Sequence, residues 1–186
     1  MVTLTVLTGG VRCGKSAAAV AAAATSGAPV TYIATAEPGD DEMAERIQRH
    51  RAERPAHWTT LEEPRDLATA VASVDLDATL VIDCLGMWVT NRLLEDPPPA
   101  SAAVVEEAAG LAGELAARPG LTLVVTNEVG SGVVPATPLG REFRDLLGSV
   151  NQAMVRAADA AYLVVAGRLL PLVDPADGLG PTGRGE

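Results

Sequence analysis

The sequence predicts one α/β domain in which a mostly parallel sheet is flanked by helices. Short β-branched runs alternate with longer helical segments along most of the chain, and this alternation is typical of parallel sheets. The short runs are apolar throughout, as expected for strands that are buried on both faces. The chain has 186 residues, 48% of them hydrophobic, which is sufficient for one core.

The elements follow in a regular order. Strands are predicted at 2–8, 29–35, 78–83, 121–126 and 160–166, where β-branched and other apolar residues are consecutive. Helices are predicted at 15–26, 40–53, 64–73, 101–118 and 138–159. The proline-rich segment 95–101 is a loop within the domain, because the alternation continues after it. Residues 1–173 therefore form the domain, and the Gly- and Pro-rich tail 174–186 is expected to be disordered.

The overall charge excludes some classes of protein. A net charge of −10 and a pI near 4.6 argue against a protein that binds nucleic acid or a membrane surface, since both need a broad basic face. The two cysteines, Cys13 and Cys84, are too few for a disulfide framework and are wrongly spaced for a zinc site. The N-terminus lacks the pattern of a signal peptide, and no stretch resembles a membrane span. We expect a cytoplasmic protein.

The motif "GGVRCGKS" matches the phosphate-binding pattern G-x-x-x-x-G-K-[ST], and it lies between a predicted strand and a predicted helix. In such a P-loop, backbone N–H groups and the helix N-terminus bind phosphate. Lys15, the only lysine of the chain, is expected to reach the β and γ phosphates, and Ser16 to bind Mg²⁺. The alternative is a glycine-rich turn arising by chance, which the strand and helix context disfavours. The candidate phosphate-binding residues are Gly9, Gly10, Val11, Arg12, Cys13, Gly14, Lys15 and Ser16.

Asp83 ends the apolar run "TLVID" and is the candidate second ligand of the metal. The carboxyl ends of parallel strands meet at one edge of the sheet, so Asp83 is expected near the P-loop. The alternative is an ordinary strand-terminal Asp that caps a turn or helix. Cys13 and Cys84 are then expected around the phosphates as small packing residues and not as reactive thiols.

The segment "RIQRHRAERPAHW" contains both histidines of the chain, together with Arg46, Arg49, Arg51 and Arg54. A helix that begins at Asp40 and ends in arginines has favourable charges at both poles, which explains the arginines structurally. His50 shares a helical face with the apolar side chains of Met43 and Ile47, so the alternative is that His50 is a packing residue. Beside a P-loop, however, an imidazole among arginines fits a nucleophile that attacks phosphorus. His57 is assigned a structural role beside Trp58, because the chemistry requires no second imidazole.

Several segments together resemble one enzyme family. They are "TGGVRCGKS", "YIATAEPGDDEMAERIQRHRAERPAHWTTLEEP", "VIDCLGMWVTN" and "VVTNEVGSGVVPATPLGREFRDLLGSVNQAMVRAADAAYLVVAG", in order over about residues 3–172. The chain is similar to the bifunctional adenosylcobinamide kinase / adenosylcobinamide-phosphate guanylyltransferase family of cobalamin biosynthesis. The resemblance implies a RecA-like P-loop fold, Mg²⁺, GTP and ATP as substrates, and adenosylcobinamide and its phosphate as acceptors. It also implies a homotrimer with the active site near the subunit boundaries.

The resemblance also assigns residues. His50 matches the family's guanylylated histidine, and Arg49 stands where some members carry a second histidine. The acidic residue at Asp83 is Glu in some relatives, which leaves direct metal binding, binding through water, or contact with the nucleotide sugar open. Besides the P-loop, the implied nucleotide contacts are Ala34, Thr35, Ala36, Arg51, Ala52, Glu53, Arg54, Glu62 and Asp83.

Two other functions also fit a P-loop. A single-function small-molecule kinase would transfer phosphate but form no covalent nucleotide at His50. A nucleotide-dependent switch would hydrolyse GTP slowly and have no corrinoid acceptor. Neither explains His50 among arginines as well as guanylylation does. The segment 124–135 is expected to form a substrate or subunit-contact loop, and Trp88 to lie in the core or an interface.

Overall fold

The computed structural model describes residues 3–178. Seven strands form one sheet in the order β3-β2-β4-β5-β1-β6-β7. All neighbouring strands are parallel except β6 and β7, which are antiparallel. The strands are β1 (Leu4–Thr8), β2 (Val30–Ala34), β3 (Thr59–Glu62), β4 (Thr79–Asp83), β5 (Thr122–Val125), β6 (Ala160–Val165) and β7 (Arg168–Leu172). The predicted single domain with a mostly parallel sheet is confirmed.

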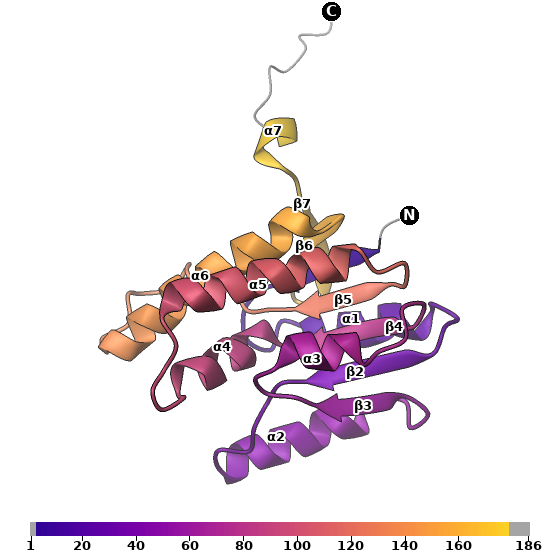
Figure 1. The fold of residues 1–186 in the computed structure, drawn as a ribbon, viewed down its shortest axis with the longest axis horizontal. Coiled ribbons are helices and arrows are strands. Elements are labelled where there is room, and N and C mark those ends of the chain that lie inside the picture. The colour runs from indigo at the N-terminus through magenta and orange to yellow at the C-terminus, as the bar shows by residue number, and fades with distance from the viewer. Residues whose placement is uncertain (1–2, 179–186) are drawn as a thin grey trace, which may run out of the picture.

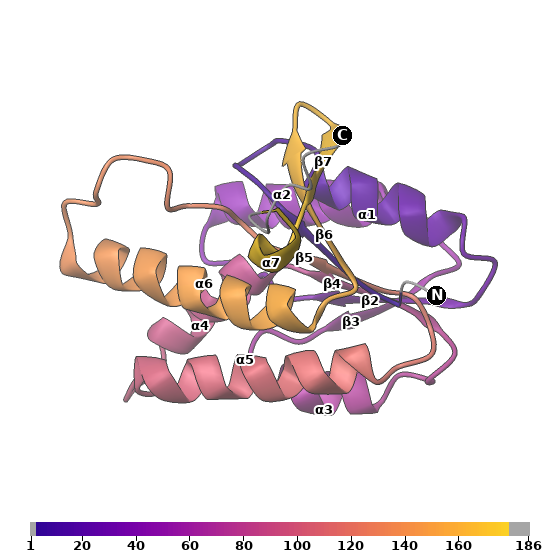
Figure 2. The ribbon, with the colours of Figure 1, turned by 90° about the horizontal axis from the view of Figure 1, so that it is seen from above.

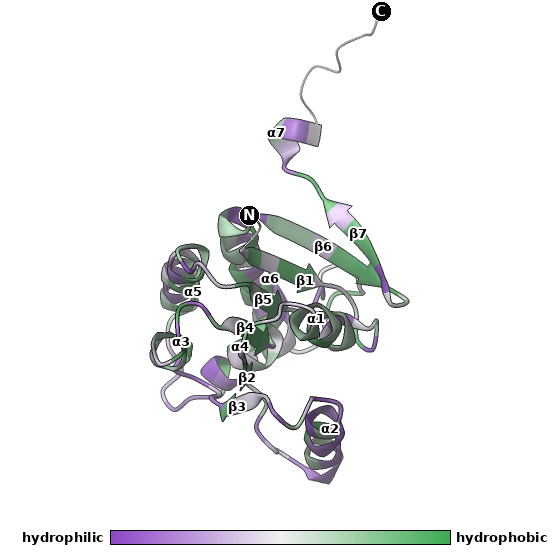
Figure 3. Ribbon diagram, turned by 90° about the vertical axis from the view of Figure 1, so that its right-hand side faces the viewer, coloured by the Kyte–Doolittle hydropathy of each residue, from purple (hydrophilic) through white to green (hydrophobic). Residues whose placement is uncertain are grey.

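Helices lie on both faces of this sheet, and the last helix extends beyond β7 (Figure 1). They are α1 (Lys15–Ala24), α2 (Asp41–Ala52), α3 (Leu67–Ala72), α4 (Leu85–Leu93), α5 (Ser101–Ala116), α6 (Pro138–Ala157) and α7 (Pro175–Gly178). Figures 2 and 3 show α1 and α2 on one face, with α3 and α5 on the other. Helix α6 packs against α5 and α4 on that second face.

Each face of the sheet has its own core. The larger core joins the sheet to α3, α4, α5 and α6, with Trp88 completely buried at its centre. The smaller core lies under α1, where the small side chains of Ala19 and Ala23 let the helix approach the strands closely. Trp88 is therefore a core residue, as predicted.

Every predicted strand and helix is present, with shifts of up to three residues at the ends. Four elements were not predicted: the edge strand β3, the short helix α4 directly after β4, the antiparallel strand β7 and the helical turn α7. Within the predicted tail, residues 175–178 form one helical turn, and 179–186 lie outside the described residues. None of the helices between residues 3 and 178 is long and apolar enough to cross a membrane.

Candidate active site

The loop between β1 and α1 has the backbone shape of a phosphate-binding loop. Gly9, Arg12 and Gly14 have positive φ angles of 147°, 57° and 103°, and they turn the chain sharply into α1. Gly14 is the N-cap of α1 and offers no side chain to the first turn of the helix. The N–H groups of that turn are therefore available to an anion, which the helix dipole also favours.

Lys15 lies inside this loop with only 7% of its surface exposed. Its Nζ donates to the carbonyl oxygens of Gly9 at 2.8 Å and Gly10 at 2.7 Å, and lies 3.6 Å from Sγ of Cys13. The ammonium group has no carboxylate partner in these contacts. A bound phosphate would thus meet an uncompensated positive charge at the bottom of the loop.

Neighbouring segments hold the loop in place. The N–H of Gly167, in the turn between β6 and β7, donates to the Cys13 carbonyl at 2.8 Å. The N–H of Glu128, just after β5, donates to the Gly9 carbonyl at 3.1 Å. The first residues of the segment 124–135 are thereby fixed to the P-loop, while Val133 and Val134 farther along are exposed.

Asp83 lies at the carboxyl edge of the sheet, as predicted. One strand, β5, separates its strand from the P-loop strand, so the two are not direct neighbours. The hydroxyl of Tyr32 donates a hydrogen bond to Oδ2 of Asp83. Burial, followed by the Asp83 charge, raises the pKa of Tyr32 well above its ordinary value, and the hydroxyl stays protonated as a donor.

Helix α2 carries His50. Its N-cap is Asp40, whose carboxylate accepts from the Met43 N–H at 2.7 Å, and its last turn is basic, as the sequence predicted. His50 is half-buried together with Met43 and Ile47, which confirms their common face. None of the side chains of α2, all of them within the described part of the chain, is fully buried. His57 is exposed and directly precedes the buried Trp58.

A cavity of about 230 Å³ lies between α1 and α2. Ser16, at the start of α1, and His50 both contribute to its wall, as do Tyr32 and Glu53. The rest of the wall consists of small or aliphatic residues of α1: Ala17, Val20, Ala21 and Ala24. The structure thus brings the candidate nucleophile and the P-loop serine to one cavity.

The remaining residues after His50 divide between the interior and the surface. The guanidinium of Arg54 stacks on the Tyr32 ring, with Cζ 3.7 Å from the ring centroid. Arg51 forms a hydrogen-bonded ion pair with Glu62 at 3.3 Å, and both side chains are mostly exposed. Ala52 is exposed.

The "ATA" residues follow β2 at the same edge. The Thr35 hydroxyl accepts from the Cys84 N–H and donates to the Cys84 carbonyl, both at 2.7 Å, and it is completely buried. Thr35 thus joins the ends of β2 and β4. Ala34 is buried and Ala36 half-buried. Burial raises the pKa of Cys84 to about 12, which fits the predicted packing role of this thiol.

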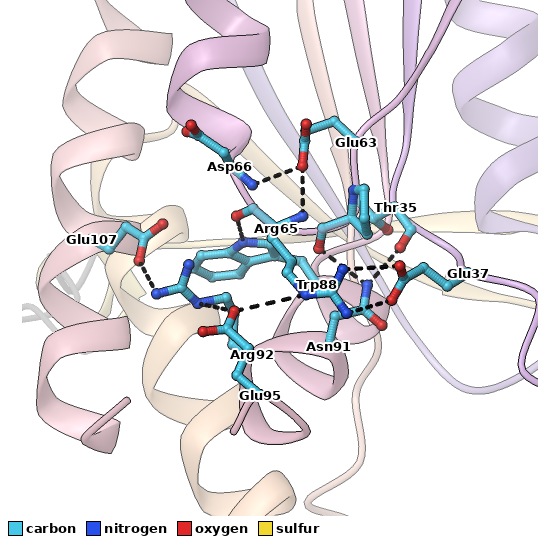
Figure 4. Close-up of polar contacts among 11 residues, drawn as sticks. Thr35, Glu37, Glu63, Arg65, Asp66, Trp88, Asn91, Arg92, Glu95 and Glu107 are labelled. Carbon is cyan, nitrogen blue, oxygen red and sulfur yellow. Dashed lines mark hydrogen bonds and ion pairs between the residues drawn. The ribbon is translucent and has the colours of Figure 1, made fainter. Parts of the chain in front are cut away.

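A network of hydrogen bonds and ion pairs connects α4 to the segments that follow β2 and β3 (Figure 4). Asn91 of α4 donates to the carbonyls of Thr35 at 2.8 Å and Pro64 at 3.0 Å, and Trp88 Nε1 donates to the Arg65 carbonyl at 2.8 Å. Arg65 also binds Glu37 through two hydrogen bonds of 2.9 and 2.7 Å. Helix α4 therefore positions the segments that follow both β2 and β3.

Sequence reasoning missed Tyr32, although a signal was present. Tyr32 is one of two tyrosines and lies in a run of aliphatic strand residues. It pairs with Val81 of β4, two residues before Asp83, so Tyr32 and Asp83 lie on the same face of the sheet.

A larger cavity of about 460 Å³, lined by residues 71–76, Glu114 and Arg118, lies at the opposite edge, where β4 begins.

Comparisons with known proteins identify the family of this chain. The family described as cobinamide kinase / cobinamide phosphate guanyltransferase matches residues 5–172. The bifunctional adenosylcobalamin biosynthesis protein CobP of Pseudomonas aeruginosa is 46% identical over 165 residues, which are 88% of this chain and 94% of that protein. The protein CobU of Salmonella typhimurium, with the same description, is 43% identical over 173 residues, covering 87% and 94%.

A solved structure supports the fold class. It is an ATPase from the type III secretion system of pathogenic bacteria, with a TM-score of 0.51 and 14% sequence identity. The alignment covers 98% of this chain and 54% of that one. The predicted P-loop fold is thereby confirmed. From the match over residues 5–172 and these relatives, the chain belongs to the cobinamide kinase / cobinamide phosphate guanyltransferase family.

Proposed function

We propose that this protein phosphorylates adenosylcobinamide and then transfers GMP to the product, through a covalent guanylyl-histidine at His50. The observation that carries this proposal is that Ser16 of the P-loop and His50 line the same cavity. Family membership favours this bifunctional activity over a nucleotide-dependent switch. The described relatives are themselves named as bifunctional biosynthesis proteins.

The kinase step uses the P-loop. The aminopropanol hydroxyl of adenosylcobinamide attacks the γ-phosphorus of ATP or GTP, loses its proton, and the nucleoside diphosphate leaves. Lys15 and the N–H groups at the start of α1 bind the phosphates and offset their charge. The protein contributes mainly position and charge, because the transferred phosphoryl group needs little covalent assistance.

The donor set fits Mg²⁺. Asp83 offers a half-buried carboxylate and Ser16 a hydroxyl, which are hard oxygen ligands. No group of three or more His, Cys, Asp or Glu side chains suited to a metal occurs in the described residues. This agrees with Mg²⁺, which is usually held by one or two side chains together with phosphates and water. When bound, the ion neutralises charge on the phosphates.

The transferase step uses His50. An imidazole nitrogen attacks the α-phosphorus of GTP, a P–N bond forms, and pyrophosphate leaves. A phosphate oxygen of adenosylcobinamide-phosphate then attacks this phosphorus, the P–N bond breaks, and adenosylcobinamide-GDP is released. The arginines of the same segment supply charge for the departing pyrophosphate. Ala34, Thr35, Ala36, Glu53 and Glu62 belong to the same proposal as residues of the nucleotide site.

The protein is further proposed to act as a cytoplasmic homotrimer. Exposed apolar side chains on β6, β7 and the residue after it support self-association: Val165, Leu169, Leu170, Leu172 and Val173. Sedimentation equilibrium should give three times the mass of the 19.0 kDa chain. A monomer at micromolar concentration would refute the assembly without affecting the chemistry.

The chemistry is tested by incubating the protein with Mg²⁺ and GTP labelled at the α-phosphate, with γ-labelled GTP in parallel. We expect α label that remains on the denatured chain, is released by acid, and resists alkali. The His50→Ala variant should retain none. His57→Ala is the matched control, because the exposed His57 is the other histidine of the chain and lies outside the cavity wall. Absence of label with GTP bound would instead favour a single-function kinase.

A further inference from the structure

Tyr32 makes two different contacts that no assigned role explains. Its hydroxyl donates to Oδ2 of Asp83, and the guanidinium of Arg54 stacks on its ring at 3.7 Å. Its ring also lines the cavity that contains Ser16 and His50. We propose that Tyr32 is a positioning residue that orients the Asp83 carboxylate and holds the C-terminal end of α2 against the sheet.

The hydroxyl contact orients the carboxylate. Tyr32 is a buried member of the smaller core, and its place on β2 is set by parallel pairing with β4. Because Tyr32 occupies Oδ2, the other oxygen of Asp83 is left for a cation or its bound water. Groups that hydrogen-bond to a metal-binding carboxylate in this way commonly change metal affinity by about 10- to 100-fold when removed.

The ring contact fixes the helix. Arg54 lies two residues after the end of α2, beyond the C-cap Glu53, and four residues after His50. In the described structure α2 has no fully buried side chain, and its ion pair between Arg51 and Glu62 is solvent-exposed and therefore weak. Nε of Arg54 is inaccessible to water and lacks a hydrogen-bond partner among the described residues. The principal contact of the Arg54 guanidinium is therefore its stacking on the Tyr32 ring.

The two contacts can be separated by substitution. Tyr32→Phe removes only the hydroxyl, whereas Tyr32→Leu also removes the aromatic ring. Val81→Ala is a matched control, because Val81 is the cross-strand partner of Tyr32 in the same core. Its aliphatic side chain can neither donate a hydrogen bond to Asp83 nor offer an aromatic ring to Arg54. It reports what general loss of core packing does to the site.

We expect Tyr32→Phe to raise by about tenfold the Mg²⁺ concentration needed for half-maximal binding of a non-hydrolysable ATP analogue, measured by calorimetry. Amide exchange in α2 should stay unchanged in this variant. Tyr32→Leu should show the same Mg²⁺ effect, and in addition α2 should exchange at least tenfold faster and His50 should be guanylylated more slowly.

Two results would overturn the inference. One is an unchanged Mg²⁺ requirement in Tyr32→Phe. The other is α2 exchange in Tyr32→Leu that equals the wild type or the Val81→Ala control. The inference rests on the proposed roles of Asp83 and His50, but the calorimetry and exchange measurements need neither cobinamide nor a covalent nucleotide. Failure of the proposed function would therefore appear separately, as absence of label on His50.

Discussion

Gly9 and Gly10 are adjacent in the P-loop, yet the structure predicts opposite outcomes for their replacement by alanine. Gly9 has a φ of +147°, and a Cβ there would lie 2.5 Å from the carbonyl oxygen of Val164 and 2.9 Å from Sγ of Cys13. At Gly10 φ is not positive, and a Cβ would meet nothing within 4 Å. We expect Gly9→Ala to destabilise the protein strongly and Gly10→Ala to change its stability little.

The magnitude follows from two costs. A side chain at a φ that essentially only glycine adopts costs about 1–3 kcal/mol. The contact with Val164 adds about 1–3 kcal/mol, since that oxygen belongs to the backbone of β6, which is paired with β1 and cannot move aside freely. Together they predict a loss of about 2–6 kcal/mol for Gly9→Ala, a large share of the 5–15 kcal/mol typical of a domain.

The assay is urea unfolding without nucleotide, followed by the fluorescence of the two buried tryptophans, Trp58 and Trp88. Gly10→Ala should unfold within about 1 kcal/mol of the wild type, because the substitution removes freedom from the unfolded chain without straining the folded one. If Gly9→Ala and Gly10→Ala share one midpoint, the described conformation of the loop is not that of the protein in solution. If Gly9→Ala yields only aggregated protein, Gly10→Ala expressed in parallel must remain soluble.

Three further predictions concern charge and polar contacts. Lys15→Met should weaken binding of an ATP analogue by about 10- to 100-fold in calorimetry, since a charge-assisted hydrogen bond contributes about 1.5–3 kcal/mol. Asn91→Ala should lower the free energy of unfolding, measured in urea, by about 2 kcal/mol, because the carbonyls of Thr35 and Pro64 lose a buried donor. Asn151→Ala is the control, because Asn151 donates to the Asn127 carbonyl and its loss leaves the carbonyls of Thr35 and Pro64 paired. Hydrogen bonds from Leu4 and Thr3 lower the pKa of Asp159, so its stabilisation is present at neutral pH and is lost as the pH falls below about 4. The stability gap between wild type and Asp159→Asn should therefore narrow progressively as the pH falls below about 4, and a gap that stays constant with pH would contradict this assignment.

The strands that the sequence predicts most clearly are those buried on both faces of the sheet. Strands such as β1 and β4 are continuous apolar runs, and burial selects for this pattern regardless of partners. Strand β3 was missed because it is an edge strand with the polar sequence "TTLE", partly exposed along its length. Strand β7 was missed because it is exposed and contains Pro171, a residue that interior strands exclude and edge strands tolerate.

The site was predictable where chemistry depends on local sequence. The P-loop is contiguous, and Asp83 is marked by the end of its strand, so both could be recognised from spacing alone. Tyr32 could not, because its partners are 51 residues away on β4 and 22 residues away beyond α2. These contacts depend on strand register and on how α2 returns to the sheet, neither of which the local pattern encodes.

The charge of α2 and its loose packing have a common explanation. A protein with a net charge of −10 repels nucleotides at long range, so positive charge must be concentrated where phosphates bind. Arginines on a buried helix would have a large desolvation cost, whereas on α2 they stay hydrated and also complement the helix dipole.

The exposure of α2 also means that few contacts would break if the helix moved. Such a movement is required if His50 must approach the α-phosphate, because the kinase step takes place at the γ-phosphate. A helix buried like α6, with four fully packed side chains, would resist such a movement. Comparing amide exchange in α2 with and without GTP tests this reasoning, and equal protection in both states would contradict it.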